Sequence, residues 1–399
     1  MKILVLNCGS SSLKYKLFEM NTSEVLAQGQ ADRIGLNDAT FRHDIKGRQS
    51  STVKASLANH HEAVQDLLAM LTDRKQGILT DMNEISGVGH RVVHGGEHFR
   101  SSVVVDSEIR QVLESTKKLA PLHNPPNLMG IDVCTKLMQG VPQVAVFDTA
   151  FHQTMPAHAY TYAIPYRYYT EDHVRRYGFH GISHRYVAYR TAEFLQKKPE
   201  DLKIITCHLG AGSSLCAVSG GKSLDTSMGF TPLSGLVMST RCGDIDPAIL
   251  FFIARKENVS LDKVIEILNR ESGVLGISGI SPDFRDLVAQ AGLNNERARL
   301  ALAVYAYSVA KGIGSLIPAA GGLDVLVFTA GIGENSPPVR KQICGFLSWL
   351  GIVLDEEKNS GGNNERIISA LESKINVLVV PTDEEKMIAG ESWAVLQKI

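Results

Sequence analysis

The sequence has no excess of either charge, with 41 basic residues, 42 acidic residues and a formal net charge of −1. A strongly basic chain would indicate nucleic acid or an anionic membrane surface as a partner, and this chain gives no such indication. Any binding of phosphate must therefore come from the local arrangement of a few groups. The 399 residues are 44% hydrophobic and 21% charged, a globular composition, and the length suits about two domains.

The chain also lacks paired cysteines and long apolar runs. Its six cysteines, at positions 8, 134, 207, 216, 242 and 344, include no C-x-x-C pair, which indicates free thiols in a reducing compartment. The apolar run Ile3–Leu6 ends at Asn7, and Lys14 and Lys16 follow, so it is too short for a signal peptide. No stretch of about 20 apolar residues is apparent. We therefore expect a cytoplasmic protein without a membrane segment.

Two common nucleotide-binding signatures are missing. Gly221-Lys222-Ser223 ends like a phosphate-binding P-loop, but Cys216 stands where that loop needs its first glycine. Gly331-Ile332-Gly333 lacks the third glycine of the dinucleotide-binding fingerprint. This absence argues against an NAD-dependent dehydrogenase.

Strand patterns alternate with helical patterns along the chain. Strands are predicted over Ile3–Leu6, Leu13–Phe18, Val88–Val93, Val144–Phe147, Leu202–Leu209, Leu215–Val218, Val325–Thr329 and Val377–Val380. Helices are predicted over His61–Leu71 and Ala298–Ile317, and after Asn124-Pro125 and Asp246-Pro247, with Asn124 and Asp246 as N-caps. This alternation favours an α/β fold with a mainly parallel sheet in each lobe.

Two strand–loop–strand segments resemble each other. Asn7–Ser12 joins the first two predicted strands, and Gly210–Ser214 joins the pair that begins at Leu202. In such turns, successive backbone N–H groups can form an anion-binding concavity, although an ordinary hairpin has the same composition. The repeat indicates an internal duplication into two lobes with a boundary near residue 150.

Arg91 lies in a glycine-bounded segment, Gly89–Gly96, that ends a strand. Its planar guanidinium suits a carboxylate or phosphate, and a structural ion pair is the alternative. His90 and His94 flank it, but a metal site there is disfavoured because no third ligand follows at a suitable spacing.

Other candidate residues stand at strand ends and in loops. Asp148 directly follows a predicted strand, where open α/β sheets place functional carboxylates. His180 precedes Gly181 and suits close approach of a ligand, although a turn histidine is nearly as plausible. Arg241 precedes a helix and could be either functional or solvated. Ser281–Arg285 offers an aromatic ring and an arginine for stacking on a base, and a capped helix start explains it about as well.

These segments together resemble the acetate kinase family. The matching runs are Leu6–Lys14, His90–Gly96, Phe179–Gly181, His208–Gly210, Gly243–Pro247, Gly331–Asn335 and Thr382–Glu385, in order along essentially the whole chain. The resemblance implies a fold of the actin-like ATPase (ribonuclease H-like) type, with two related lobes and an ATP cleft between them. The N-terminal lobe would comprise residues 1–150 and the C-terminal lobe 151–384. A helix at about 385–399 could pack back on the first lobe.

The resemblance implies an activity and the residues that carry it. The activity is reversible, Mg²⁺-dependent, in-line transfer of the γ-phosphoryl group of ATP to acetate, in a homodimer. The implied catalytic residues are Arg91, Asp148, His180 and Arg241. The implied acetate-binding residues are Arg91, Val93, Leu122, His123, Phe179 and Pro232. The implied nucleotide-binding residues are Ser10, Ser12, Lys14, His208, Leu209, Gly210, Ala211, Gly212, Asp283, Phe284, Arg285, Gly331, Ile332, Gly333, Glu334 and Asn335. Asn7 and Glu384 would hold Mg²⁺, for which Mn²⁺ could substitute.

The chemistry agrees with these roles, because phosphoryl transfer needs positioning and charge neutralisation more than covalent chemistry. A carboxylate nucleophile is already ionised at pH 7. The chain departs from the family pattern at Ala211, where Asn is usual, and at Ser239, where Gly is usual. Propionate kinase is the nearest alternative, and an ATP-hydrolysing binding protein is a more distant one. Arg91 beside a small apolar pocket favours the kinase.

Overall fold

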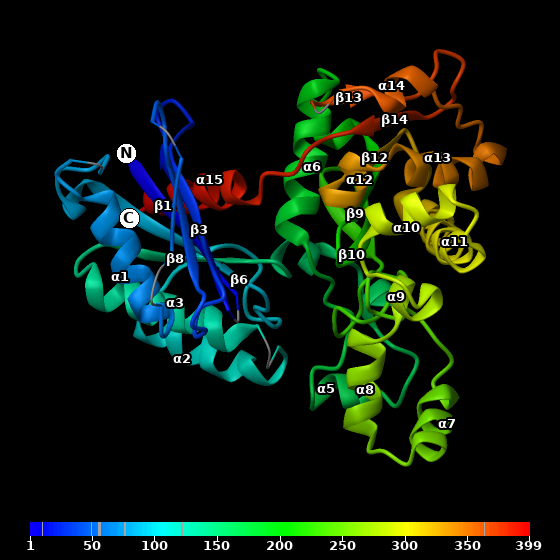
Figure 1. Cartoon of the computed structure of the whole chain (residues 1–399), viewed down its shortest axis with the longest axis horizontal. Helices are drawn as coiled ribbons and strands as arrows, with labels where there is room; N and C mark the ends of the chain where they lie inside the picture. The colour runs from blue at the N-terminus through cyan, green and yellow to red at the C-terminus, as the bar shows by residue number, and fades with distance from the viewer. Residues whose placement is uncertain (10, 49, 55–56, 76, 121–122, 363) are drawn as a thin grey trace. The chain divides into compact units, whose positions relative to one another are not determined.

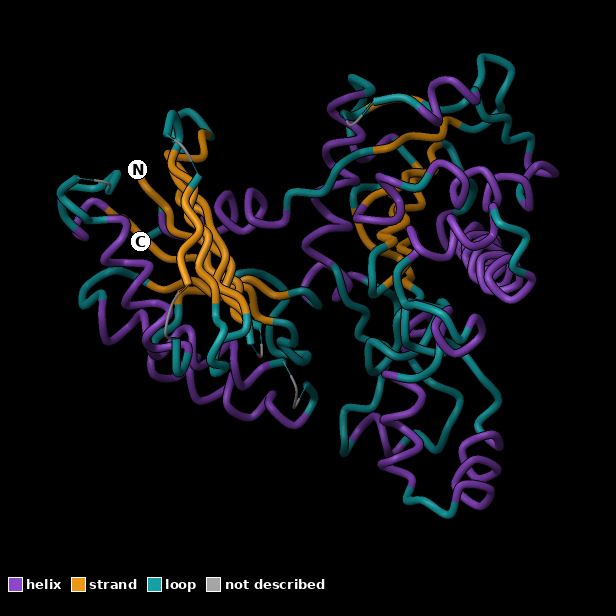
Figure 2. Tube along the Cα trace, viewed as in Figure 1, coloured by secondary structure: helices purple, strands orange, loops and turns teal. Residues whose placement is uncertain are grey.

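The computed structural model describes residues 1–9, 11–48, 50–54, 57–75, 77–120, 123–362 and 364–399. The chain forms two compact units: unit 1 consists of Met1–Phe151 and Asp383–Ile399, and unit 2 of His152–Thr382. Each unit is built on one β-sheet with helices packed against it (Figure 2). The predicted α/β class is confirmed.

Unit 1 contains an eight-stranded sheet in the order β5-β4-β3-β2-β1-β6-β8-β7. Figure 1 labels β1, β3, β6 and β8 of this sheet. The β1–β6 and β6–β8 pairs are parallel, and the other pairs are antiparallel. The elements are β1 (Lys2–Cys8), β2 (Ser12–Glu19), β3 (Glu24–Asp32), β4 (Thr40–Ile45), β5 (Ser51–Lys54), α1 (His60–Leu71), β6 (Ile85–Val92), β7 (Val103–Val104), α2 (Ser107–Ser115), α3 (Asn124–Leu137), β8 (Gln143–Phe147) and α15 (Glu384–Leu396).

The helices of unit 1 cover both faces of its sheet. In α1 the buried residues recur at helical spacing, and the Asn59 side chain caps the helix by accepting from Glu62 N over 3.1 Å. The α1 and α3 helices pack on the sheet face that carries Val88. On the opposite face α15 lies so close to β6 that a side chain at Gly87 or Gly89 would collide with it. The long return of the chain to this face therefore completes the core of unit 1.

Unit 2 contains a six-stranded sheet in the order β11-β10-β9-β12-β14-β13. Its strands are β9 (Lys203–Leu209), β10 (Ser213–Ser219), β11 (Lys222–Thr226), β12 (Val325–Thr329), β13 (Arg366–Ile367) and β14 (Asn376–Val379). Its helices are α4 (Ala157–Tyr160), α5 (Arg167–Thr170), α6 (Gly181–Phe194), α7 (Ala248–Glu257), α8 (Leu261–Arg270), α9 (Gly273–Ser278), α10 (Phe284–Gly292), α11 (Glu296–Ala320), α12 (Ala330–Asn335), α13 (Pro337–Phe346) and α14 (Glu356–Ser360). Short 3-10 helices occur in unit 1 as η1 (Met82–Glu84) and η2 (Thr116–Lys118), at the junction as η3 (Ala150–Thr154), and in unit 2 as η4 (Pro199–Asp201) and η5 (Ser348–Leu350).

The long helix α11 forms the centre of the main core of unit 2. Its buried residues pack with β9, β10, β12 and the helices α9, α10 and α13. Among the described residues α11 alone is long and apolar enough to cross a membrane by length and composition. Arg297, Arg299 and Lys311 interrupt it, so it contains no run of 20 apolar residues. Core helices meet the same criterion, and the packing of α11 is that of a core helix.

The same topology occurs in both sheets. The order β3-β2-β1-β6-β8 in unit 1 matches β11-β10-β9-β12-β14 in unit 2, with two antiparallel pairs followed by two parallel pairs in each. The expected duplication is thus visible in the fold. The expectation of mainly parallel sheets is wrong, because only three adjacent strands in each sheet run parallel and the hairpins beside them are antiparallel.

Local helix boundaries also differ from expectation. Asn124 is not an N-cap: it lies inside α3, whose cap position is His123, and its amide is used elsewhere. Asp246 lies one residue before the cap of α7, and its Oδ1 accepts from Ala248 N over 2.8 Å. Gly331–Asn335, which directly follows a predicted strand, forms most of the short helix α12.

Candidate active site

Arg91 and Asp148 lie at the ends of two adjacent parallel strands and form an ion pair in unit 1. Arg91 Nε and Nη2 donate to the two carboxylate oxygens of Asp148 over 3.1 and 2.5 Å. Glu384 Oε2 lies 3.9 Å from Arg91 Nε. Burial lowers the pKa of Arg91, but attraction to Asp148 and Glu384 outweighs burial and raises that pKa overall. The guanidinium is therefore a permanent positive charge in a fixed orientation.

Asn7 lies beside this pair, because Leu6 of β1 is in register with His90 of β6. The side-chain oxygens of Asn7 and Glu384 are hard ligands, and Mg²⁺ is commonly held by one or two such groups together with substrate phosphates. Within the described ranges no group of three or more His, Cys, Asp or Glu residues could hold a metal by itself. The donors present fit a magnesium ion that arrives with a nucleotide.

The loop between β1 and β2 is anchored at Gly9. Gly9 N donates to Ser12 O over 2.9 Å, and the Gly9 carbonyl accepts from His60 Nε2 over 2.7 Å. Lys14 follows on β2 with an exposed side chain. Ser10, a predicted nucleotide-binding residue, lies outside the described residues. Gly9 is thus held by hydrogen bonds to Ser12 and His60, and the exposed cation of Lys14 lies close by in the sequence.

Two buried asparagines of α3 hold the chain after β6, and the sequence analysis did not predict this role. Asn127 Oδ1 accepts from Val93 N over 3.1 Å, and its Nδ2 donates to Cys8 O over 2.7 Å. Asn124 Oδ1 accepts from His94 N over 3.1 Å, and its Nδ2 donates to His94 O over 2.9 Å. These amides join the first loop to the segment that follows Arg91. The only sequence signal is their presence at the start of a predicted helix.

In unit 2, His180 and Arg241 both lie next to Gly212. A side chain at Gly212 would lie 3.2 Å from Arg241 Nη1 and 3.5 Å from His180 Cε1. His180 precedes α6 in a left-handed conformation, with φ of 55°. The ring of His208 stacks on the ring of His180 with 4.1 Å between centroids. Glycine at position 212 therefore keeps the space between an imidazole and a guanidinium open.

Arg241 is half-buried, and no carboxylate contacts it within the part of the chain that the structure describes. Its Nη1 contacts Pro232 O at 3.4 Å and Met238 Sδ at 3.8 Å. Burial lowers the pKa of Arg241 because no neighbouring anion opposes it. Such an uncompensated charge makes an anion the natural ligand of this position.

Arg241 also lines a cavity of about 980 Å³ in unit 2. The other lining residues are Gly210, Ala211, Gly212, Ser239, Thr240, Pro282, Asp283, Phe284, Arg285, Val288, Gly331, Ile332, Asn335, Ser336 and Pro338. The cavity joins the second Gly-Ser loop to two segments more than 70 residues away, and all three were predicted to bind nucleotide. The predicted nucleotide-binding residues did not include six other lining residues, and only their adjacency to predicted residues could have indicated them: Ser239, Thr240, Pro282, Val288, Ser336 and Pro338.

Four of the predicted nucleotide-binding residues of unit 2 do not line this cavity. His208 Nδ1 bonds to Ser183 Oγ at 2.8 Å. Glu334 Oε1 accepts from Ala330 N at 2.7 Å and Thr382 N at 3.1 Å, and so joins the ends of two strands. The remaining two, Leu209 and Gly333, are buried in the sheet and in α12.

The adenosine-site prediction at Asp283–Arg285 rests on residues with strong local partners. Asp283 caps α10 and forms an ion pair with the exposed Arg285, whose Nη2 lies 2.5 Å from Asp283 Oδ2. Phe284 is 5% exposed and meets Tyr305 edge-on at 4.5 Å. The Phe284 ring therefore lines the cavity from within the core. Of the three residues, Arg285 is the one whose side chain is exposed.

The predicted acetate-binding residues are divided between the units. Val93 and His123 belong to unit 1, and Phe179 and Pro232 to unit 2; Leu122 lies outside the described residues. Val93 and Phe179 are buried, whereas His123 is exposed just before α3. Each buried residue lies one or two positions from a predicted catalytic residue of its own unit.

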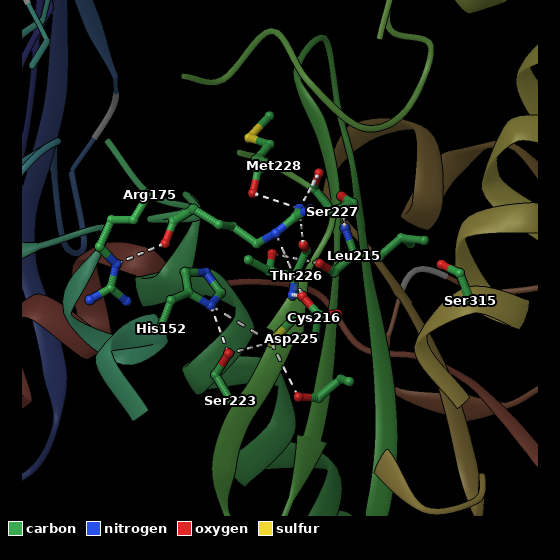
Figure 3. Close-up of polar contacts among 12 residues, drawn as sticks. His152, Arg175, Leu215, Cys216, Ser223, Asp225, Thr226, Ser227, Met228 and Ser315 are labelled. Carbon is green, nitrogen blue, oxygen red and sulfur yellow. Dashed lines mark hydrogen bonds and ion pairs between the residues drawn. The ribbon is translucent and has the colours of Figure 1, made fainter. Parts of the chain in front are cut away.

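A buried polar cluster supports the chain before His180. Figure 3 shows His152 beside Ser223 and Cys216. His152 Nδ1 lies 2.8 Å from Ser223 Oγ, and its Nε2 lies 3.0 Å from Phe179 O. Burial lowers the pKa of His152 to about 4 and raises that of Cys216 to about 12. The cluster is neutral at pH 7, and its role is to fix the backbone rather than to react.

Similarity to known proteins extends over almost the whole chain. The Acetokinase family model matches residues 2–390. An acetate kinase of Thermoanaerobacter pseudethanolicus is 56% identical over 393 residues, covering 98% of each chain. The crystal structure of Porphyromonas gingivalis acetate kinase matches with a TM-score of 0.94 at 46% identity, covering 99% of each chain. A propionate kinase structure from Francisella tularensis matches with a TM-score of 0.92 at 40% identity, also covering 99% of each chain.

Proposed function

The chain belongs to the acetokinase family, and we propose that it is an acetate kinase. The reaction is reversible transfer of the γ-phosphoryl group of ATP to acetate, giving ADP and acetyl phosphate by direct in-line displacement. The observation that most supports this proposal is the cavity of unit 2, where Arg241 adjoins a glycine-rich loop and contacts no carboxylate among the described residues. An acid-dependent production of acyl phosphate, trapped as the hydroxamate, tests it directly.

In this mechanism the two arginines neutralise the transferring group. Arg241 would bind the γ-phosphoryl oxygens, and His180, next to the same Gly212 space, would donate a hydrogen bond to them. Arg91 would bind the acetate carboxylate and the phosphoryl group, while Asp148 fixes its guanidinium. Acetate is ionised at pH 7, so no strong base is required. The protein contributes charge, orientation and proximity.

Asn7 and Glu384 would hold Mg²⁺ through their side-chain oxygens, and Mn²⁺ is an acceptable substitute. When bound, the ion supplies charge neutralisation at the β- and γ-phosphate oxygens. The backbone of Gly210–Ser214 would bind the ATP phosphates, and the walls formed by α10 and α12 would hold the adenosine. Replacing Glu384 with Gln should raise the Mg²⁺ concentration needed for half-maximal activity more than it changes KM for acetate.

The acid-binding residues decide between acetate and longer acids. Val93, Phe179 and Pro232 are proposed to surround the methyl group, and the 40% identical propionate kinase structure makes propionate the second candidate substrate. Comparing kcat/KM for formate, acetate, propionate and butyrate with saturating MgATP distinguishes the two. A maximum at propionate would replace the proposed activity with propionate kinase.

The remaining proposals concern context. A homodimer in the cytoplasm follows from the family resemblance, and the unpaired cysteines agree with a reducing compartment. Sedimentation velocity at several protein concentrations would test the dimer. Fractionation of the source cells would test the location.

A further inference from the structure

A chain of buried hydrogen bonds lies behind His180. His180 Nδ1 lies 2.8 Å from Ser214 Oγ, and Ser214 Oγ lies 2.7 Å from His184 Nε2. His184 Nδ1 lies 2.7 Å from Thr206 Oγ1. Ser214, His184 and Thr206 are completely buried, on β10, α6 and β9 respectively. The sequence analysis singled out none of these three residues, and the mechanism described above gives them no role.

The direction of these hydrogen bonds follows from their chemistry. Burial, together with the neighbouring His152 and His208, holds the pKa of His184 well below its ordinary value, so His184 is neutral and has one N–H. The Thr206 hydroxyl has a nearby acceptor in His184 Nδ1 at 2.7 Å and a much more distant one in Cys216 O at 3.5 Å. Thr206 therefore donates to His184 Nδ1, since a hydrogen bond at 3.5 Å is marginal.

The remaining directions are then determined. His184 Nδ1 accepts a proton, so its single N–H is on Nε2 and donates to Ser214 Oγ. The Ser214 hydroxyl proton is left to point at His180 Nδ1, which accepts. A neutral His180 consequently carries its own proton on Nε2.

We propose that Thr206, His184 and Ser214 form a relay that fixes neutral His180 in the Nε2–H tautomer, ready to donate to the transferring phosphoryl group. This inference rests on the proposed kinase function. The three residues do not touch substrate in this scheme; they are positioning residues that decide which imidazole nitrogen carries the proton. The transfer can then use a neutral histidine as a donor, without an imidazolium.

Neighbouring groups also restrict the orientation of the His180 ring. The His208 ring is stacked on one side at 4.1 Å between centroids. Behind the backbone, the Phe179 carbonyl can only accept, so His152 donates to it from Nε2 and accepts from Ser223 at Nδ1. Burial lowers the pKa of both His152 and His184, so these two neighbours of the His180 segment are neutral. A ring held in this way keeps Nδ1 directed at Ser214.

The test compares Thr206→Val with Thr206→Ser in the full-length protein. Valine has nearly the same volume but no hydroxyl, whereas serine keeps the donor. The tautomer of His180 is observed by ¹⁵N NMR of histidine-labelled protein, with its signals assigned by their absence in His180→Ala. We expect Nε2–H in the wild type and in Thr206→Ser, and a population of Nδ1–H in Thr206→Val and Ser214→Ala. Thr191→Val is the matched control, because Thr191 is equally buried and its hydroxyl has no partner among the described residues.

Kinetics supply a second readout. Loss of a transition-state donor costs about 10²–10³ in kcat, so partial loss of the correct tautomer should lower kcat by about tenfold in Thr206→Val, with KM for both substrates nearly unchanged. Thr206→Ser and Thr191→Val should keep wild-type kcat. A wild-type His180 protonated on Nδ1, or an unchanged tautomer in Thr206→Val, would overturn the relay. A wild type with the expected tautomer but no acetate-dependent transfer would instead overturn the proposed function.

Discussion

Ala211 offers the sharpest test of the proposal that the second Gly-Ser loop binds nucleotide. The resemblance to the acetate kinase family implies Asn at this position, where this chain has Ala. Ala211 is exposed, lines the cavity and does not have a left-handed backbone. Its carbonyl accepts from Ser239 N at 3.3 Å, and Gly210 N donates to Gly212 O at 3.1 Å. An asparagine side chain can therefore enter the cavity without rebuilding the loop.

The size of the effect follows from one added hydrogen bond. A hydrogen bond to a charged group contributes about 1.5–3 kcal/mol. The position is exposed to water, so we take the lower value, and about 1.4 kcal/mol corresponds to a factor of ten in binding. Ala211→Asn should lower KM for ATP by about tenfold and leave kcat within about tenfold, the pattern of uniform binding. The assay is hydroxamate formation with acetate saturating and MgATP varied.

Ala211→Leu is the matched control, because leucine has nearly the shape of asparagine and no donor. It should not lower KM for ATP. The reasoning fails if Ala211→Asn and Ala211→Leu behave alike. It also fails if Ala211→Asn raises kcat by orders of magnitude at constant KM, since that would reveal a contact made only in the transition state.

Four further predictions have defined outcomes. Arg91→Lys and Arg241→Lys should each lower kcat by about 10³–10⁵, since lysine cannot form the planar fork; near-normal turnover would remove that arginine from the mechanism. Val93→Ala should shift the kcat/KM ratio toward propionate by about 1–3 kcal/mol, and an unchanged ratio would place the methyl pocket elsewhere. Arg340 is fully buried and bonds to carbonyl groups at the end of α12, so Arg340→Lys should lower the free energy of unfolding in urea by about 3 kcal/mol; an unchanged midpoint would contradict this. Burial lowers the pKa of His94 to about 3, so on acidification the unfolded chain binds a proton at this histidine before the folded chain does. The stability that neutral His94 contributes should therefore be lost as pH falls below about 6.5. Tm of the wild type should fall on acidification, whereas a Tm that stays constant from pH 7 to pH 4 would argue against it.

The strands that carry the site could be predicted because their signal is local. Val144–Phe147 is a continuous apolar run followed by an aspartate, and the structure has β8 end there with Asp148 beside Arg91. Whether neighbouring strands run parallel or antiparallel was harder to predict. Alternating strands and helices suggested parallel pairing, yet Asn7–Ser12 is short enough that its flanking strands must form an antiparallel hairpin.

The polar support of the site was largely invisible in the sequence. Asn124 has the sequence context of an N-cap, but its amide satisfies both backbone groups of His94, thirty residues away. His184 and Thr206 have the spacing of ordinary core residues, and their hydrogen bonds depend on how α6 packs against the sheet. Periodicity indicates burial; it does not identify the partner of a buried polar group.

The position of α15 has a consequence for how the chain acquires its structure during synthesis. Its residues Ile388, Ser392 and Leu396 cover the sheet face at Gly87 and Gly89, but they leave the ribosome only after all of unit 2. Until then the first half of the nascent chain has an apolar sheet face without its cover, whereas unit 2 is continuous in sequence. Unit 2 should therefore reach its native packing while unit 1 still depends on a chaperone or on completion of the chain.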